Sequence, residues 1–256
     1  MKSVRQKKAL ICDMDGVIYH EDRLLPGARQ FVQWLKDEHK RYVFLTNNSA
    51  STPEQLAHKL HRLGIEAEAE HFYTSAQATA AFLASYGGGS AYVIAGAGTE
   101  RALTAAGIEV TDADPDWVVI GETKSYDYES IRRAVSLVRG GARLIGTNPD
   151  VTGPGGDGVV PATGALISPV ELAANKEAYF VGKPNPLMMR HALKKLGCRR
   201  EETVIIGDRM DTDIVAGVEA EIETVLVLSG VTARDDLSDY AYRPRRVVEN
   251  VGRIVP

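Results

Sequence analysis

A repeated alternation of short apolar runs and helical patterns constrains the fold of this chain more than any other feature. The first cycle has an apolar run at residues 8–12, a helical pattern with Phe31 and Leu35 on one face, and a second apolar run at 42–45. Strands separated by helices in this way form parallel sheets, because each helix carries the chain back to the end where the next strand starts. The sequence therefore predicts an α/β fold.

The same alternation continues to the end of the chain. The expected strands of the middle part lie at 91–94, 117–120 and 143–145, and helices are expected at 99–106 and 128–139. The expected strands of the last part lie at 179–181, 203–206 and 224–228. The stretch 153–158 is rich in glycine and is predicted to be a loop.

Two helix starts are predicted from their capping residues. Thr52 precedes Pro53 and is followed by Gln55, which is the pattern of a capping box with proline in the first helical position. Asn185 precedes Pro186 in the same way, and this second helix is expected to end near residue 197.

The composition excludes several classes of protein. The 256 residues carry a formal net charge of −4, so no overall basic field is available to hold a nucleic-acid backbone. The apolar runs are far shorter than the roughly 20 residues that a membrane span needs. Cys12 and Cys198 do not make a disulfide framework, which favours a reduced setting. We expect a cytoplasmic protein with no nucleic-acid or membrane partner.

Polar residues follow four of the expected strands at the point where each strand ends. In an open parallel sheet, ligands bind outside the carboxyl ends of the strands, so these residues are expected to meet at one edge. They are Asp13 and Asp15, Thr46 and Asn47, Lys183, and Asp208 with Asp211 and Asp213. Each motif taken singly is typical of an ordinary turn, helix cap or exposed lysine. Together they favour a functional site.

The expected set of side chains suits phosphoryl transfer with Mg²⁺. Carboxylates are the oxygen ligands that Mg²⁺ prefers, and a lysine, a hydroxyl group and backbone amides can neutralise or bind phosphoryl oxygens. A carboxylate beside the metal can act as a nucleophile, and a second acid can protonate the leaving oxygen. Gly16, directly after Asp15, permits a tight turn of the backbone.

These residues, in this order, resemble the four motifs of the haloacid dehalogenase (HAD) superfamily. The motifs are Asp13-Met14-Asp15-Gly16-Val17, Thr46-Asn47-Asn48, Gly182-Lys183-Pro184, and Gly207-Asp208 through Asp213. Four further segments are similar to the NagD-type branch of the superfamily. They are Phe72 to Ala76, Gly121-Glu122-Thr123, Thr147-Asn148-Pro149-Asp150, and Leu226 to Val231.

The resemblance implies a Rossmann-like parallel-sheet core with a larger inserted α/β cap domain. The core would comprise residues 1–79 and 178–256, and the cap residues 80–177. The activity implied is hydrolysis of small phosphate monoesters, such as nucleoside monophosphates (UMP among them) or sugar phosphates. Mg²⁺ is the implied cofactor and a small-molecule phosphate ester the implied partner. The chain could be a monomer or a homo-oligomer.

The resemblance also implies a role for each motif residue. Asp13 would be the nucleophile and a metal ligand, and Asp15 would be the general acid and base, with its backbone carbonyl on the metal. Thr46 and Asn47 would bind the phosphoryl group, whose charge Lys183 would neutralise. In the fourth motif, Asp208 would bind the metal, and Asp213 would lie next to the metal ligands without binding the metal itself. Asp211 is left out of the site.

The cap is expected to select the substrate. Asn148, Asp150 and the segment 161–164 match cap positions that tend to face the active site in the family. An Asn-Pro-Asp sequence is also a strong turn former, so a role in the turn alone carries equal weight.

Three other activities remain open alternatives. A phosphotransferase or mutase of the same superfamily would use the same motifs. A phospho-aspartate signalling module would share the aspartate, the lysine and Mg²⁺, but Asp15 and the inserted domain favour turnover. A catalytically silent binding module on the same fold is the third. The sequence Gly96-Ala97-Gly98 resembles part of a dinucleotide fingerprint, but Arg101 replaces its third glycine, so a strand-to-helix turn is favoured.

Overall fold

The computed structural model describes residues 1–155 and 158–256, and these form two compact units. Unit 1 comprises residues 1–46, 56–73 and 183–256, and unit 2 comprises residues 47–55 and 74–182. Each unit has its own parallel sheet. The domain limits predicted from the sequence, at 79/80 and 177/178, remain predictions.

Unit 1 is built on a six-stranded sheet whose strand order is β15-β14-β13-β1-β4-β5. The strands are β1 (Ala9–Cys12), β4 (Arg41–Thr46), β5 (Phe72–Thr74), β13 (Thr203–Gly207), β14 (Glu223–Val227) and β15 (Arg246–Val248). The pairs from β15 to β4 are parallel. The chain runs outward from β1 to β5 and returns at β13, so the order of the strands reverses between β1 and β13. Such a switch point is where open α/β sheets bind their ligands.

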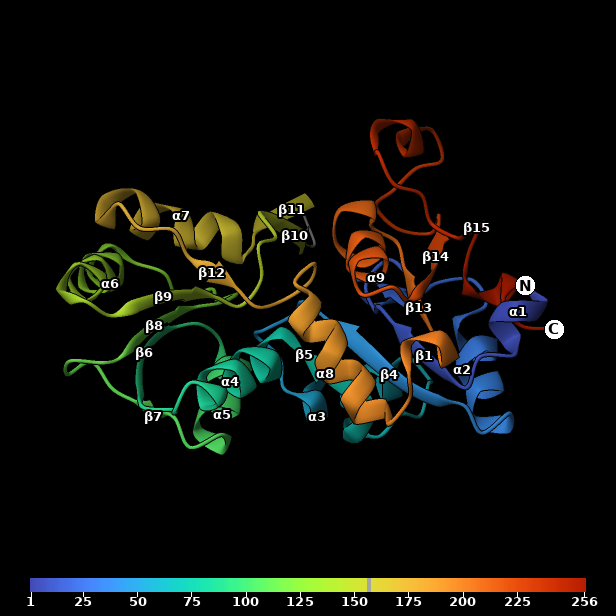
Figure 1. Cartoon of the computed structure of the whole chain (residues 1–256), viewed down its shortest axis with the longest axis horizontal. Helices are drawn as coiled ribbons and strands as arrows, with labels where there is room; N and C mark the ends of the chain where they lie inside the picture. Colours follow the sequence, from blue (N-terminus) through green and yellow to red (C-terminus); the bar gives the residue numbers. More distant parts are fainter. Residues whose placement is uncertain (156–157) are drawn as a thin grey trace. The chain divides into compact units, whose positions relative to one another are not determined.

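Helices cover both faces of this sheet (Figure 1). Side chains of α2 (Ala28–Asp37) and α3 (Pro53–Arg62) pack with alternate strand residues such as Leu10 and Phe44 in one apolar core. On the other face, α8 (Pro186–Leu196) packs on β4 and α9 (Val215–Glu219) on β14. The alternation of side chains along each strand supplies both faces, so the middle of each central strand is apolar. Smaller elements of unit 1 are α1 (Lys2–Arg5), β2 (Tyr19–His20) and β3 (Arg23–Leu24).

Both predicted helix starts are confirmed. The Thr52 hydroxyl accepts a hydrogen bond from the Gln55 backbone N–H, and the Gln55 side chain accepts one from the Thr52 N–H. The Asn185 side chain accepts a hydrogen bond from the Leu187 N–H at the start of α8. That helix is followed by Gly197 in the left-handed conformation, as expected for a helix stop.

Unit 2 is built on a five-stranded sheet with the order β12-β9-β8-β6-β7, in which all pairs are parallel. The strands are β6 (Ser90–Ile94), β7 (Glu109–Val110), β8 (Trp117–Ile120), β9 (Arg143–Gly146) and β12 (Tyr179–Phe180). Helices α4 (Ser75–Ser85) and α5 (Ala97–Ala105) pack on each other, and so do α6 (Tyr128–Gly140) and α7 (Thr163–Ala174). Figure 1 shows one pair on each side of the sheet.

One predicted strand belongs to the other sheet. Residues 179–181 were expected as a strand of the core sheet that carries Asp13 and Asp208, but β12 pairs with β9 in unit 2. That prediction was wrong. At this pairing the absence of a side chain on Gly146 leaves room for the Phe180 ring, because a Cβ atom there would lie 2.4 Å from the ring. An apolar run specifies a strand, but does not specify which of two parallel sheets receives it.

The prediction of a loop over residues 153–158 was also wrong for the part that the structure describes. Strands β10 (Thr152–Gly155) and β11 (Gly158–Pro161) form an antiparallel ribbon in which Thr152 pairs with Pro161. Residues 156 and 157 lie outside the described part. A two-stranded ribbon has only edge strands, where glycine and proline are tolerated.

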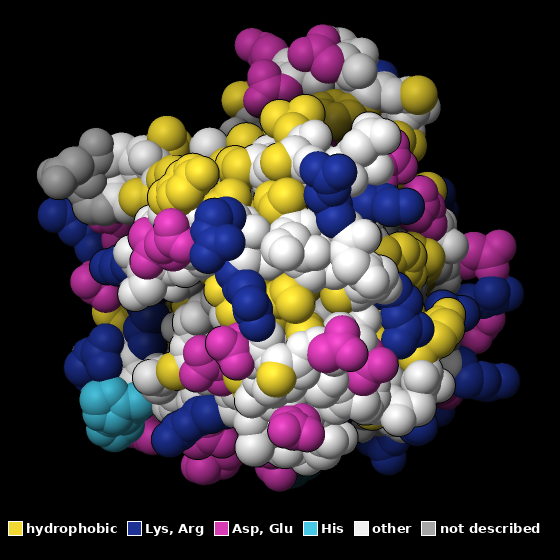
Figure 2. Space-filling model, turned by 90° about the vertical axis from the view of Figure 1, so that its left-hand side faces the viewer, with side chains coloured by type: hydrophobic (Ala, Val, Ile, Leu, Met, Phe, Trp, Pro, Cys, Tyr) yellow, Lys and Arg dark blue, Asp and Glu magenta, His cyan; other side chains and the backbone are white. Residues whose placement is uncertain are grey.

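No helix among the described residues is long and apolar enough to span a membrane. Figure 2 shows one face of the molecule, on which Lys and Arg side chains are interspersed with Asp and Glu side chains and with apolar ones. On this face there is no broad field of one sign, which fits the small net charge of the chain.

Candidate active site

Three strands of unit 1 deliver functional side chains to the switch point of its sheet. Asp13 follows β1 directly, Asp208 follows β13 directly, and Thr46 is the last residue of β4. β1 lies between β13 and β4 in the sheet, so the three strand ends are neighbours. Lys183 reaches the same place from the segment before α8, and Asp213 from the turn of π-helix at Met210–Ile214.

The buried ammonium group of Lys183 joins these segments. It donates hydrogen bonds to Asp13 Oδ1 at 2.7 Å, to Asp213 Oδ1 at 2.7 Å and to the Leu45 carbonyl at 3.0 Å. Burial by itself would lower the pKa of Lys183, but the charges of the two carboxylates and the hydrogen bonds to them raise it above its ordinary value. The lysine is therefore a fixed positive charge in contact with Asp13.

Three carboxylates cluster at this positive charge, and two of them contact it. Asp13, Asp208 and Asp213 each place an oxygen within 4.8 Å of the other two. Burial and the charge of Asp213 raise the pKa of Asp13 to about 7 against the opposing effect of Lys183. Burial, followed by the charges of Asp213 and Asp13, raises the pKa of Asp208 well above its usual range. The cluster has more acids than bases, and oxygen ligands of this kind fit a hard divalent cation.

Glycines make room for the two acids of the fourth motif. A Cβ atom on Gly16 would lie 2.4 Å from Asp208 Oδ2, and one on Gly230 would lie 2.0 Å from the same atom. The Val231 N–H donates a hydrogen bond of 2.7 Å to this oxygen, which fixes the carboxylate. A Cβ atom on Gly207 would lie 2.2 Å from the side chain of Asp213. Sequence reasoning anticipated the turn at Gly16 but gave Gly230 no role.

Asp15 is less buried than the three clustered acids. Its carboxylate lies 3.6 Å from His20 Nδ1. Burial raises the pKa of Asp15, while Lys59 and His20 oppose the rise. A carboxyl group with a raised pKa holds its proton closer to neutral pH, which is what a general acid requires.

In unit 2, three residues of the predicted site form one hydrogen-bonded group. Asn47 Nδ2 donates to Asp150 Oδ2 at 2.8 Å, and Asn148 Nδ2 donates to the Asn47 carbonyl at 2.8 Å. The Asp150 N–H donates in turn to Asn148 Oδ1 at 3.1 Å. The sequence predicted Asn47 as a phosphate ligand and the other two as cap residues, and gave no reason to connect them.

Glu122 is a partly buried acid to which sequence reasoning gave no role of its own. It follows β8, and its carboxylate accepts a hydrogen bond from the Ser49 N–H at 3.3 Å. Burial raises the pKa of Glu122 to about 7, and the charge of Asp150 adds to the rise. The same signal that identified Asp13, an acid at the end of an apolar strand, was present here in Gly121-Glu122-Thr123.

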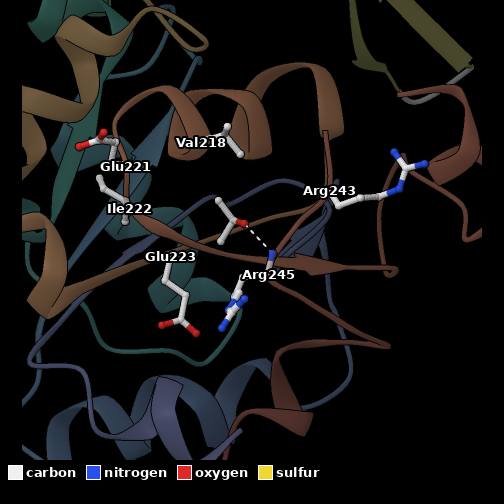
Figure 3. A pocket seen from close by; sticks show the side chains of 7 residues that line it. Val218, Glu221, Ile222, Glu223, Arg243 and Arg245 are labelled. Carbon is white, nitrogen blue, oxygen red and sulfur yellow. Dashed lines mark hydrogen bonds between the residues drawn. The ribbon is translucent and has the colours of Figure 1, made fainter. Parts of the chain in front are cut away.

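A surface pocket of unit 1 lies away from the clustered acids. Its lining includes Glu223 and Thr224, the first two residues of β14, together with Arg243 and Arg245 (Figure 3). The Arg245 N–H donates to the Thr224 hydroxyl at 2.9 Å. This is the amino end of the strand, whereas ligands of parallel sheets bind at the carboxyl ends. We therefore assign the pocket no part in the site.

Comparison with known proteins places the chain among phosphatases. Residues 10–109 match the family described as haloacid dehalogenase-like hydrolase, and residues 180–254 match a second HAD-hydrolase-like family. The dihydroxyacetone phosphatase of Corynebacterium glutamicum is 46% identical over 94% of this chain and 88% of its own. The ribonucleotide monophosphatase NagD of Escherichia coli is 41% identical over 96% of this chain and 98% of its own.

Solved structures agree with these relatives over nearly the whole chain. The structure of E. coli NagD superposes with a TM-score of 0.92 and covers 96% of this chain and 98% of its own. A 4-nitrophenylphosphatase from Thermotoga maritima superposes with a TM-score of 0.94 at 32% identity, over 99% of this chain and 98% of its own.

The raised pKa of Glu122 predicts a stability difference that depends on pH. The folded state keeps this proton up to a pH of about 7, whereas the unfolded chain releases it near its ordinary value of 4.5. Stability therefore falls as pH rises between these values. In urea unfolding, the free energy of unfolding of wild type should fall between pH 5 and pH 8 by about 2 kcal/mol more than that of Glu122→Gln, because the glutamine has no proton to release. An identical pH dependence in both proteins would contradict the assignment.

Proposed function

The chain belongs to the NagD-type branch of the haloacid dehalogenase superfamily and is a hydrolase acting on phosphoric monoesters, and we propose that it works through an aspartyl phosphate formed on Asp13 and requires Mg²⁺. The observation that supports this most is the Lys183 ammonium group fixed 2.7 Å from Asp13 at the switch point of the sheet. That geometry gives a carboxylate a defined orientation beside a positive charge.

In the first proposed step, an oxygen of Asp13 attacks phosphorus. The bond between phosphorus and the ester oxygen breaks as the new bond forms, and Asp15 gives its proton to the departing alcohol. Lys183, held in place by Asp213, offsets part of the charge on the transferring group. Thr46 and Asn47 bind the phosphoryl oxygens.

In the second proposed step, Asp15, now ionised, takes a proton from water. The water oxygen attacks phosphorus, the bond to Asp13 breaks, and inorganic phosphate leaves. The two steps restore both carboxyl groups to their starting states, so no further reagent is consumed.

The clustered acids fit a divalent cation by their chemistry and their spacing. We propose that Asp13, Asp208 and the backbone carbonyl of Asp15 would hold Mg²⁺, with Asp213 behind them on Lys183. A bound Mg²⁺ would offset negative charge on the phosphoryl group and favour the ionised form of Asp13.

We propose residues 80–177 as the substrate-selecting cap, with Asp150 and Asn148 as selecting residues. Relatives are named for dihydroxyacetone, ribonucleotide and sugar phosphates, which share a hydroxyl-rich leaving group. An acidic acceptor such as Asp150 suits hydroxyl groups and disfavours a second anion. Asn148 has no exposed surface and contributes by orienting Asn47 and Asp150. Small phosphate monoesters, with UMP and sugar phosphates among them, are the proposed substrates.

Replacing the nucleophile should abolish turnover. We expect Asp13→Asn to release no phosphate from any member of a panel of nucleoside monophosphates, sugar phosphates, dihydroxyacetone phosphate and 4-nitrophenyl phosphate. Wild type should release phosphate with Mg²⁺ and lose this activity in EDTA. Asp211→Asn is a matched control, since Asp211 is an exposed acid of the fourth motif that pairs with Arg209 and is left out of the proposed site. It should keep wild-type activity.

Replacing the proposed acid and base should slow the reaction without removing the nucleophile. Asp15→Asn is expected to lower kcat by roughly 10²- to 10⁴-fold, the usual contribution of general acid–base catalysis. With 4-nitrophenyl phosphate, whose leaving group needs little protonation, the second step should become limiting. Rapid quenching should then show phosphate on the protein. Wild-type turnover in this variant would rule out the role of Asp15.

A further inference from the structure

The segment 47–51, directly after Thr46, is closely surrounded by glycines within unit 2. A Cβ atom on Gly98 would lie 2.6 Å from the Ser51 carbonyl oxygen and 2.7 Å from that of Ser49. One on Gly96 would lie 3.0 Å from the Cα atom of Ala50. The two glycines of Gly96-Ala97-Gly98 therefore allow two backbone segments to approach closely, which explains this sequence without dinucleotide binding.

Hydrogen bonds tie the same segment to the first turn of α5 and to the end of β8. The Gly98 N–H donates to the Ala50 carbonyl and the Thr99 hydroxyl to the Ser49 carbonyl, each at 2.9 Å. From the end of β8, the Glu122 N–H donates to the Ser49 hydroxyl at 2.9 Å. Ser49 and Thr99 have no exposed surface. The segment is thus an integral part of unit 2.

The carboxylate of Glu122 lies at the centre of this arrangement. It accepts a hydrogen bond from the Ser49 N–H at 3.3 Å, and the Ala50 backbone and the Asn148 side chain also favour its ionised form by lowering its pKa. All three partners are donors, because the Asn148 oxygen is engaged by the Asp150 N–H. A carboxylate can accept hydrogen bonds from all of these donors. The side-chain amide of a glutamine at this position would instead place its NH₂ group against one of them.

The residues that Glu122 fixes hold Asn47 in turn. Asn148 Nδ2 donates to the Asn47 carbonyl, and the Asn47 side chain donates to Asp150, which is itself oriented by Asn148. The Ser75 hydroxyl adds a hydrogen bond of 2.6 Å to the Asn47 carbonyl. Both polar ends of Asn47 are therefore positioned by this network.

We propose that Glu122 is a positioning residue for phosphate binding, which acts through the segment 47–50 and Asn148 to orient Asn47. This inference rests on the proposed role of Asn47 as a ligand of the phosphoryl group. Its consequence is that an acid from the end of β8 sets the affinity of the enzyme for phosphate.

The inhibition constant of inorganic phosphate against 4-nitrophenyl phosphate measures this affinity. The assay is run at pH 8, above the Glu122 pKa of about 7, so that the wild-type carboxylate is ionised. Glu122→Gln should raise the inhibition constant and KM about tenfold, as expected from the loss of one hydrogen bond to a charged group, with kcat within about twofold. The control Glu109→Gln makes the same change at an exposed position of unit 2 and should behave as wild type.

A double-mutant cycle with Asn47→Ala separates the two proposals. If Glu122 acts through Asn47, Glu122→Gln should have little further effect on the inhibition constant once Asn47→Ala is present. An unchanged inhibition constant in Asn47→Ala alone would overturn the phosphate-binding role of Asn47. Two outcomes would overturn the positioning role of Glu122 when Asn47→Ala itself raises the inhibition constant. One is a wild-type inhibition constant in Glu122→Gln, and the other is that the effects of the two substitutions simply add in the double variant.

Thr99→Val provides a second route if Glu122→Gln does not fold. It removes the hydrogen bond to the Ser49 carbonyl with little change of volume and leaves Glu122 in place. It should raise the inhibition constant in the same direction and lose its effect when combined with Asn47→Ala. A folded Thr99→Val variant with wild-type affinity for phosphate would overturn the proposal that this segment orients Asn47.

Discussion

The buried ammonium group of Lys183 is the interaction on which the site of unit 1 depends. It joins three segments that are distant in the sequence. This group donates hydrogen bonds to the Leu45 carbonyl near the end of β4, to Asp13 after β1 and to Asp213. Without this positive charge three carboxylates would share one buried place, which is costly unless they are protonated or bound to metal. The parallel sheet creates this problem by bringing strand ends together, and the same cluster of carboxylates could hold a metal ion.

In unit 2, hydrogen bonds from backbone and amide groups hold the acidic side chains. Glu122 accepts a hydrogen bond from the Ser49 backbone N–H, and Asp150 accepts one from the Asn47 side-chain amide. The result is a rigid polar network around the segment that follows Thr46. Thr46 itself belongs to unit 1 and Asn47 to unit 2, so the second motif of the family lies across the boundary between the two packing units. Under the proposed function, phosphate binding and substrate selection would be linked through neighbouring residues of one short segment.

Much of the fold could be predicted because its signals are local. Capping at Thr52 and Asn185 depends on residues within one turn, and acids after β1 and β13 can be recognised from the strands alone. The failures concern information that is not local. The strand at 179–180 pairs with β9 in the sheet of unit 2, where Gly146 leaves room for Phe180, and residues 152–155 and 158–161 form a ribbon through pairing rather than propensity. Glu122 had a readable signal, an acid after an apolar strand, but its partners in 49–50 become visible only in three dimensions.

The central claim is that the phosphoryl group is transferred to the protein before it reaches water. The stereochemical course of hydrolysis tests this most directly, with a phosphorothioate ester made chiral at phosphorus by oxygen isotopes and hydrolysed in isotopically labelled water. Two in-line displacements, first by Asp13 and then by water, each invert the configuration, so the account predicts overall retention. Overall inversion would mean a single displacement by water, and would contradict a covalent role for Asp13.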